Sequence, residues 1–464
     1  MITQRSSRRS LEHIALTTLA LGLTLAWVVA LRNTLRLDAI AYALAAFVLS
    51  LDVFDLLLRF SRVRSLGVNA FRARPGASIH LAASAPSTNV DITLRPYALL
   101  MSVHNLESVM DEFLARALPH RDLMWIVDDC STDHTALRLR SAGFRCLSLL
   151  DNVKKPAALR ILLTKLPTDI HTVIVMDPDC RITAVDDRRH TLESCLLHFQ
   201  HTGAAALCPR IGIEGGSMLE ALQRLEYMLG FCFGRRSLAD FCTTAGLAIY
   251  RRDALESALA RHSLSIYAED LETTLDLLGR GERVYYDARI HAVTEVPRTV
   301  SSWFSQRVGW YFGLCKVYVE RWQDTLAVAR RTPFAFYQYV IYLGVFSLLL
   351  LPLKIVSCII LVLSFANGLG AIVGVPLVPD TPATSPLLFV VVYLKYLVLV
   401  VLSIGVATGR RERRALLPMA PFYFFYASLQ ALPAAIGCCN WITLKFLGRR
   451  LYDDHYETDV RRLL

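Results

Sequence analysis

One long stretch of this 464-residue chain has no segment apolar enough to cross a bilayer, and apolar runs lie on both sides of it. From Ser65 to Thr332, charged and turn-forming residues recur, whereas a membrane span needs roughly 20 apolar residues. This arrangement predicts one soluble domain flanked by membrane spans. With 54% hydrophobic and 19% charged residues, the composition excludes a disordered chain, and the long stretch argues against a purely membranous channel.

Two apolar runs, at about 14–31 and 39–58, precede the soluble stretch. Arginines flank them on both outer sides, which favours a helical hairpin over residues 1–64 with both ends in the cytoplasm, although the first run alone could be a signal peptide. Asp52 and Asp55 share one helical face of the second run. They are either functional intramembrane carboxylates or partners of Arg59 or Arg62.

The region 333–447 is predicted to hold the remaining spans. Residues 334–365 form either one kinked span or two short ones, and 387–406 form a plainer span. The proline-containing run 416–447 is expected to be a hairpin or an interfacial segment, followed by a basic cytoplasmic tail over 448–464. We therefore expect a multi-pass α-helical protein with five or six spans in a plasma or inner membrane. Its net charge of +10 then belongs to cytoplasmic loops and lipid headgroups and not to a nucleic-acid site.

The soluble stretch alternates between short apolar segments and helical patterns. Candidate strands at 97–103, 123–127, 146–150 and 172–176 each end in a polar loop. This alternation predicts an α/β domain with a mostly parallel sheet and helices on both faces. In such sheets, ligands bind beyond the carboxyl ends of the strands.

Carboxylates follow two of these strands, as Asp128-Asp129 and as Asp177-Pro178-Asp179. At one edge of a sheet they would repel each other unless a cation or hydrogen-bond donors lay between them. Asp177 and Asp179 offer hard oxygen ligands for Mg²⁺ or Mn²⁺. Asp128 and Asp129 can accept hydrogen bonds from a uracil N–H or from ribose hydroxyls. Each acidic pair alone is also typical of an ordinary surface turn.

Taken in order along residues 97–313, seven segments resemble the family 2 glycosyltransferases of GT-A fold. Among these, the chain is most similar to the membrane-embedded synthases of hyaluronan, chitin, cellulose and poly-N-acetylglucosamine. The segments are Asn105/Glu107, Asp128-Asp129-x-Ser131-x-Asp133, Asn152-x-x-Lys155-x-Ala157-Ala158-Leu159, Asp177-x-Asp179, Thr244-Ala245-Gly246, Glu269-Asp270 and Gln306-Arg307-x-x-Trp310. The resemblance implies a GT-A domain over 65–296, inserted between transmembrane helices, and interfacial amphipathic helices over 297–332.

The resemblance also implies a role for each matched residue. Asp270, in the pair with Glu269, would be the catalytic base, and Asp177 and Asp179 would hold Mg²⁺ or Mn²⁺. Trp310 and Gly246 would contact the acceptor. A UDP-sugar donor would be held by Asn105, Glu107, Asp128, Asp129, Lys155, Gln306 and Arg307. The chemistry agrees, because an acceptor hydroxyl needs a positioned base, worth roughly 10²–10⁴-fold in rate.

The match departs from the family pattern at three places. Gly309 stands where an arginine usually precedes the tryptophan, so a cation near the leaving group is missing unless Arg307 replaces it. Ala268 replaces a threonine, and Val153-Lys154 replaces a glycine-rich turn. The aromatic and basic composition of 297–332 is also typical of helices at a membrane interface, whatever the role of Trp310.

The leading interpretation is an inverting enzyme that extends a polysaccharide at the cytoplasmic membrane face and exports it through its own spans. One alternative is a membrane lipid as the acceptor, and another is a non-catalytic subunit that binds nucleotide sugars. By resemblance, the sugar is N-acetylglucosamine or glucose, and a small membrane partner subunit is left open. Eleven cysteines without regular spacing indicate a reducing compartment.

Overall fold

The computed structural model describes residues 51, 53–63, 94–185, 191–264, 267–375 and 386–452. It divides into two compact units, one with residues 71–351 and 432–464, and one with residues 1–70 and 352–431. Most of the predicted N-terminal hairpin, including Asp52, lies outside the described residues. Residues 53–63 are helical, and Asp55 accepts a hydrogen bond from Arg59 at 2.8 Å.

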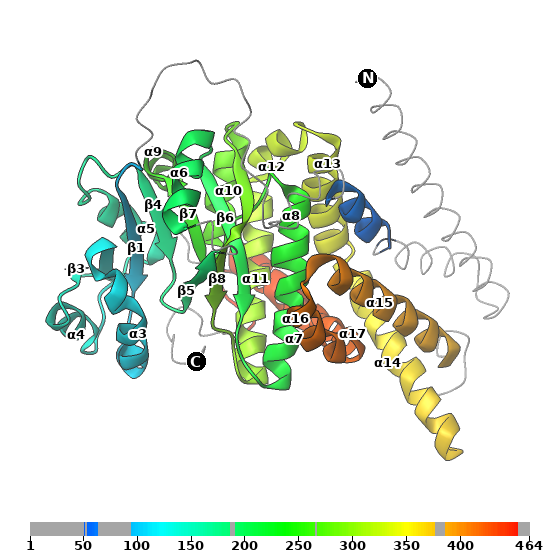
Figure 1. The fold of residues 1–464 in the computed structure, drawn as a ribbon. Coiled ribbons are helices and arrows are strands. Elements are labelled where there is room, and N and C mark those ends of the chain that lie inside the picture. Colours follow the sequence, from blue (N-terminus) through cyan, green and yellow to red (C-terminus); the bar gives the residue numbers. More distant parts are fainter. Residues whose placement is uncertain are drawn as a thin grey trace, which may run out of the picture. The chain divides into compact units, whose positions relative to one another are not determined.

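An eight-stranded sheet with the order β3-β2-β1-β4-β7-β6-β8-β5 forms the centre of the first unit (Figure 1). Strands β1 to β4 are parallel where they pair, and so are β6 and β8, whereas β7 is antiparallel to both neighbours and β5 to β8. The strands are β1 Tyr97–Val103, β2 Met124–Asp128, β3 Arg145–Ser148, β4 Thr172–Met176, β5 Cys180–Val185, β6 Ala206–Ile213, β7 Leu247–Arg251 and β8 Val284–Thr294. The predicted α/β fold and its four candidate strands are confirmed.

Helices cover both faces of the sheet, because alternate residues of each buried strand point to opposite sides. In β1, Leu99 and Met101 pack with one apolar cluster, and Ala98 and Leu100 pack with the other. The first cluster takes in α3 Met110–Ala117, α4 Thr135–Ser141 and α6 Leu192–Thr202. The second takes in α5 Lys155–Leu163, α9 Arg252–Ala260 and α10 Glu269–Gly279. The sheet is therefore packed between two apolar cores, one on each face.

Further helices of this unit come from three parts of the chain. Between β6 and β7 lie α7 Met218–Tyr227, the π-helical turn η4 Met228–Gly234 and α8 Arg235–Leu238. The predicted interfacial segment forms α11 Val300–Glu320 and α12 Trp322–Ala329. Helix α18 Ala431–Leu447 packs closely on α11, since a side chain at Gly437 would come within 2.5 Å of the carbonyl oxygen of Val308. The side-chain oxygen of Asn440, within α18, accepts hydrogen bonds from the N–H groups of Leu451 and Tyr452, which follow the helix.

Within the described part of the chain, three helices are long and apolar enough to cross a membrane: Leu351–Val373, Phe389–Ala407 and Arg410–Leu447. The run 334–365 is divided at Leu350 into a shorter apolar helix, Pro333–Leu349, and α14 Leu351–Val373. The shorter helix packs within the sheet-containing unit, because Tyr339 donates a hydrogen bond to the carbonyl of Phe241 at 2.7 Å. The run 416–447 is helical, with a 3₁₀ turn at Leu417–Met419.

Candidate active site

A cavity of about 570 Å³ lies at the carboxyl ends of the parallel strands. His104 follows β1, Asp129 follows β2, and Asp177 follows β4, and all three line the cavity. The start of α10 and the middle of α11 line it as well. The predicted edge of the sheet therefore does gather polar side chains from distant parts of the chain.

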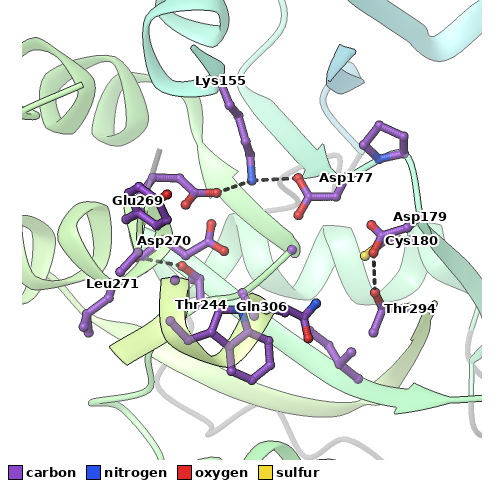
Figure 2. A pocket seen from close by; sticks show the side chains of 18 of the residues that line it. Lys155, Asp177, Asp179, Cys180, Thr244, Glu269, Asp270, Leu271, Thr294 and Gln306 are labelled. Carbon is purple, nitrogen blue, oxygen red and sulfur yellow. Dashed lines mark hydrogen bonds and ion pairs between the residues drawn. The ribbon is translucent and has the colours of Figure 1, made fainter. Parts of the chain in front are cut away.

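Glu269 and Asp270 begin α10, with Ala268 before them in the left-handed region at φ 55°. A helix N-terminus favours carboxylates, because its unpaired N–H groups carry partial positive charge. The carbonyl of Asp270 accepts a hydrogen bond from Thr274 at 2.7 Å, and its carboxyl group points into the cavity (Figure 2). Burial raises the pKa of Asp270 to about 6, Lys155 opposes the shift, and Glu269 adds to it.

Lys155 connects two of the acidic segments. It begins α5 directly after Lys154, whose φ of 70° lies in the region that favours glycine, where the family has its glycine-rich turn. Its Nζ lies 2.6 Å from Glu269 Oε1 and 2.6 Å from Asp177 Oδ1 (Figure 2). Burial opposes the charge of Lys155, but the surrounding carboxylates hold its pKa well above the usual value. The lysine is therefore a fixed cation inside an acidic cavity.

Asp177 and Asp179 flank Pro178 at the end of β4. The N–H of Asp177 donates to the carbonyl of Gly246 at 2.7 Å, and Asp179 Oδ2 accepts from Thr294 Oγ1 at 3.0 Å. A side chain at Gly246 would come within 2.7 Å of Asp177 Oδ2, so this close approach requires glycine. Burial and the charge of Asp177 raise the pKa of Asp179 to about 6.

The Gln306-Arg307-x-x-Trp310 segment presents only part of its polar groups to the cavity. Gln306, Gly309 and Trp310 line it, whereas Arg307 is absent from its described lining. Arg307 is fully buried, with its guanidinium carbon 4.0 Å from the centre of the Trp310 ring and Nη2 2.6 Å from Glu226 Oε2. Arg307 therefore packs against the tryptophan ring, and its predicted contact with the donor stays a prediction.

Residues 173–409, just over half of the chain, match the family described as "Glycosyl transferase family group 2". The chain belongs to this family. The predicted family 2 resemblance is thereby confirmed, and the protein is a sugar transferase. The narrower likeness to membrane-embedded polysaccharide synthases stays a prediction.

Solved glycosyltransferase structures resemble the chain at low identity. The mannosyltransferase PcManGT from Pyrobaculum calidifontis, in complex with GDP-Man and Mn²⁺, is 16% identical over 85% of this chain and 98% of its own, with a TM-score of 0.48. Glucosyl-3-phosphoglycerate synthase from Mycobacterium tuberculosis, with Mn²⁺ and UDP-glucose, is 16% identical over 49% of this chain and 79% of its own, with a TM-score of 0.31. A search of curated protein sequences gives no match.

The donor residues predicted after β1 and β2 have different surroundings in this glycosyltransferase. Asp128 and Asp129 are both buried, but only Asp129 is among the described residues that line the cavity. Its carboxylate accepts a hydrogen bond from the N–H of Val153 at 2.8 Å. The same lining includes neither Asn105 nor Glu107. The side-chain oxygen of Asn105 accepts a hydrogen bond from the N–H of Thr132 at 2.8 Å. The carboxylate of Glu107 accepts a hydrogen bond from the ring of His134. These two residues hold the loop after β2, and their predicted contact with the donor stays a prediction.

Asp177 and Asp179 could supply two of the oxygen ligands of a divalent cation, but not a complete coordination shell. Across the described ranges, no group of three or more His, Cys, Asp and Glu side chains is placed to hold a metal by itself. Two carboxylates leave coordination positions for phosphate oxygens and water, which is how Mg²⁺ usually binds beside nucleotides. The raised pKa of Asp177, caused by burial and opposed by Lys155, also indicates a site that favours added positive charge.

Several residues that line the cavity are not predicted by the sequence. Tyr227, Phe231 and Arg235 form one wall, with the Tyr227 and Phe231 rings stacked at 4.4 Å and the Arg235 guanidinium 4.1 Å from the Phe231 ring. The four-residue spacing of the two aromatics was the available signal, since such pairs share a helical face. Thr294, which holds Asp179, lies at the end of β8, far along the chain from the motif it supports.

Proposed function

We propose that this glycosyltransferase moves a sugar from a UDP-sugar to the hydroxyl group of a growing polysaccharide, with inversion at the anomeric carbon. The observation that carries the proposal is the convergence of Asp270, Lys155 and Asp177 on one cavity, with the lysine 2.6 Å from both Asp177 and Glu269. A base, a cation and metal-type ligands are the groups that such a transfer requires.

Asp270 acts as the general base. Its carboxylate takes the proton of the acceptor hydroxyl while the oxygen forms a bond to the anomeric carbon. The bond from that carbon to the diphosphate oxygen breaks, and UDP leaves with the electron pair. A pKa of about 6 suits this role, because the group is mostly deprotonated near neutral pH and is still basic enough to accept a proton.

The leaving diphosphate needs positive charge around it. Lys155 supplies one charge from the N-terminus of α5, where helix N–H groups also favour anions. Asp177 and Asp179 would hold Mg²⁺ or Mn²⁺, which when bound neutralises charge on the diphosphate. Because Lys155 already contacts Asp177, the cation site and the lysine act on the same end of the donor.

Two acceptor classes compete for the other side of the cavity. Gln306 and Trp310 favour a sugar, because indole rings pack well on the apolar faces of pyranosides. A membrane lipid is the second candidate, since the lining also includes aliphatic and aromatic side chains at Leu106, Val109, Phe113, Leu314 and Leu343. Transfer at the cytoplasmic membrane face and export through the protein's own spans belong to the first candidate.

The test uses membranes containing the protein, incubated with UDP-N-acetylglucosamine, UDP-glucose or GDP-mannose and either Mg²⁺ or Mn²⁺. Released nucleoside diphosphate measures turnover, and partition of the labelled sugar between polymer and lipid extract identifies the acceptor class. Asp270→Asn should lower turnover by about 10²–10⁴-fold while donor binding persists. Asp253→Asn is the matched control, because this largely exposed aspartate of α9 pairs with Arg251 and is absent from the cavity's described lining.

Three outcomes contradict the proposal. Undiminished turnover in Asp270→Asn would remove its role as base. Donor binding with no release from any of the three sugars would favour the non-catalytic subunit. Label found only in the lipid extract would replace the polysaccharide acceptor with the lipid.

A further inference from the structure

Among the described charged residues beside the cavity, Arg307 is the most deeply buried, with about 1% of its side chain exposed. Moving a guanidinium out of water is strongly unfavourable unless an opposite charge and hydrogen bonds compensate for it. Glu226, at the end of α7, supplies that charge at 2.6 Å, and Gln306 accepts a further hydrogen bond from Arg307. The pair joins α7 to α11 across 81 residues of sequence.

The ion pair, in which Arg307 is buried and Glu226 partly buried, lies against the Trp310 ring, where the proposed function places the acceptor. The Arg307 guanidinium carbon is 4.0 Å from the Trp310 ring centre, close enough for a strong cation–π contact. Tyr227, the neighbour of Glu226, has its own ring centre 6.3 Å from that of Trp310. One face of the indole is therefore covered by the arginine, while Trp310 still lines the cavity.

The glycine at position 309 makes this arrangement important. A residue without a side chain leaves nothing at position 309 to brace the neighbouring indole or to place a charge in the cavity. Arg307, three residues before Trp310, lies on the same helical face and contacts the ring from below. The side chain that packs against the Trp310 indole is therefore the buried Arg307 and not a residue at position 309.

We propose that Glu226 and Arg307 are positioning residues that hold the Trp310 indole with one face covered and the other turned to the acceptor sugar. This inference rests on the proposed function, which places the acceptor at Trp310. Neither side chain touches the reacting atoms. Glu226 orients Arg307, and Arg307 orients the ring.

The first experiment measures turnover as nucleoside diphosphate release, using whichever donor the wild-type protein accepts. Glu226→Gln should lower turnover by about 10–100-fold, the effect of misplacing a bound group by about 1 Å, while the donor KM stays nearly constant. In a Trp310→Phe background the same substitution should cost about twofold or less, because its effect passes through the indole. Equal losses in both backgrounds, or a matching rise in donor KM, would overturn the proposal.

Glu226→Gln leaves a buried arginine without its partner charge and so could unfold the protein. The double variant Glu226→Leu/Arg307→Met avoids this problem, because apolar replacement of a whole buried ion pair is often neutral for stability. It should unfold at the wild-type temperature and yet show the same loss of turnover. Wild-type turnover in the folded double variant would overturn the proposal. Glu282→Gln is the control, since Glu282 pairs with Arg251 and is absent from the cavity's described lining.

A second experiment is independent of catalysis. The chain has six tryptophans, so the emission of each protein minus that of its Trp310→Phe counterpart reports on Trp310 alone. Acrylamide should quench this difference signal more in Glu226→Gln and in the double variant than in the wild type. Equal quenching in all three would refute the positioning role. If the wild-type protein released no diphosphate from any donor, the proposed function would be wrong. The quenching measurement would still test whether Glu226 and Arg307 position the Trp310 indole.

Discussion

Replacing Gly246 by alanine tests how closely the cavity controls Asp177. A Cβ at this position would lie 2.7 Å from Asp177 Oδ2 and 3.2 Å from Cys180 Sγ. Comfortable contact requires roughly 3.5 Å, so the carboxylate must retreat by about 0.8 Å. Asp177 also pairs with Lys155 at 2.6 Å, and the retreat would disturb that contact.

The expected loss of activity follows from this displacement. Misplacing a group that holds the donor by about 1 Å costs on the order of 10²-fold in rate, or about 2.7 kcal/mol of transition-state stabilisation. Mg²⁺ tolerates such a shift poorly, because it demands near-ideal octahedral geometry. We therefore expect Gly246→Ala to lower kcat/KM by about 100-fold, with a stability loss of about 1–3 kcal/mol from overpacking.

The assay measures diphosphate release against donor and Mg²⁺ concentration, together with thermal unfolding. Gly216→Ala is the matched control, because no atom lies within 4 Å of a Cβ built at that exposed position. Wild-type kcat/KM in a folded Gly246→Ala protein would show that the Asp177 carboxylate can move without cost. The position of Asp177 would then not control the cation site.

Three further predictions concern charge and packing. Burial raises the pKa of Asp270 to about 6, and only the deprotonated base accepts a proton. We therefore expect kcat/KM to rise with pH through about 6 and to level off above it. A flat profile from about pH 5 to 7 would contradict the role of Asp270 as the base. Lys155→Met should lower turnover by about 10²–10³-fold and weaken UDP binding in equilibrium dialysis, and unchanged UDP affinity would exclude a donor contact. Gly437→Ala should lower the midpoint of thermal unfolding by roughly 5 °C, because the new methyl group would lie 2.5 Å from the carbonyl oxygen of Val308. An unchanged midpoint would mean that α18 can shift on α11 without cost.

Local patterns along the chain were enough to predict the sheet and the edge that carries the site. Short apolar segments, each followed by a polar loop, predicted β1, β2, β3 and β4 and the acidic residues that follow β2 and β4. The same patterns did not predict the antiparallel β7 between β4 and β6, because strand order depends on long crossovers. Strand β7 matters for the site, since Gly246 directly precedes it and supports Asp177.

Individual roles within the motifs were harder to predict. Asp128 and Asp129 are adjacent in sequence and equally buried, yet only Asp129 lines the cavity, because successive side chains at a strand end point in opposite directions. Arg307 was predicted to contact the donor, which stays a prediction, whereas its pairing with Glu226 and its contact with the Trp310 ring were not predicted. Spacing within a motif carries no information about a partner from another helix.

The order of motifs and the apolar runs were sufficient to predict the family, the α/β class and the presence of helices suited to a membrane, because each is a local or composition-level property. Folding was needed to bring Lys155 within 2.6 Å of Glu269, which lies 114 residues further along the chain, and to place Arg307 beneath the indole. Such contacts depend on how the sheet and its two cores position the strand and helix ends. The charge balance of the cavity is therefore a property of the packed molecule, in which low dielectric and close approach strengthen each pairing.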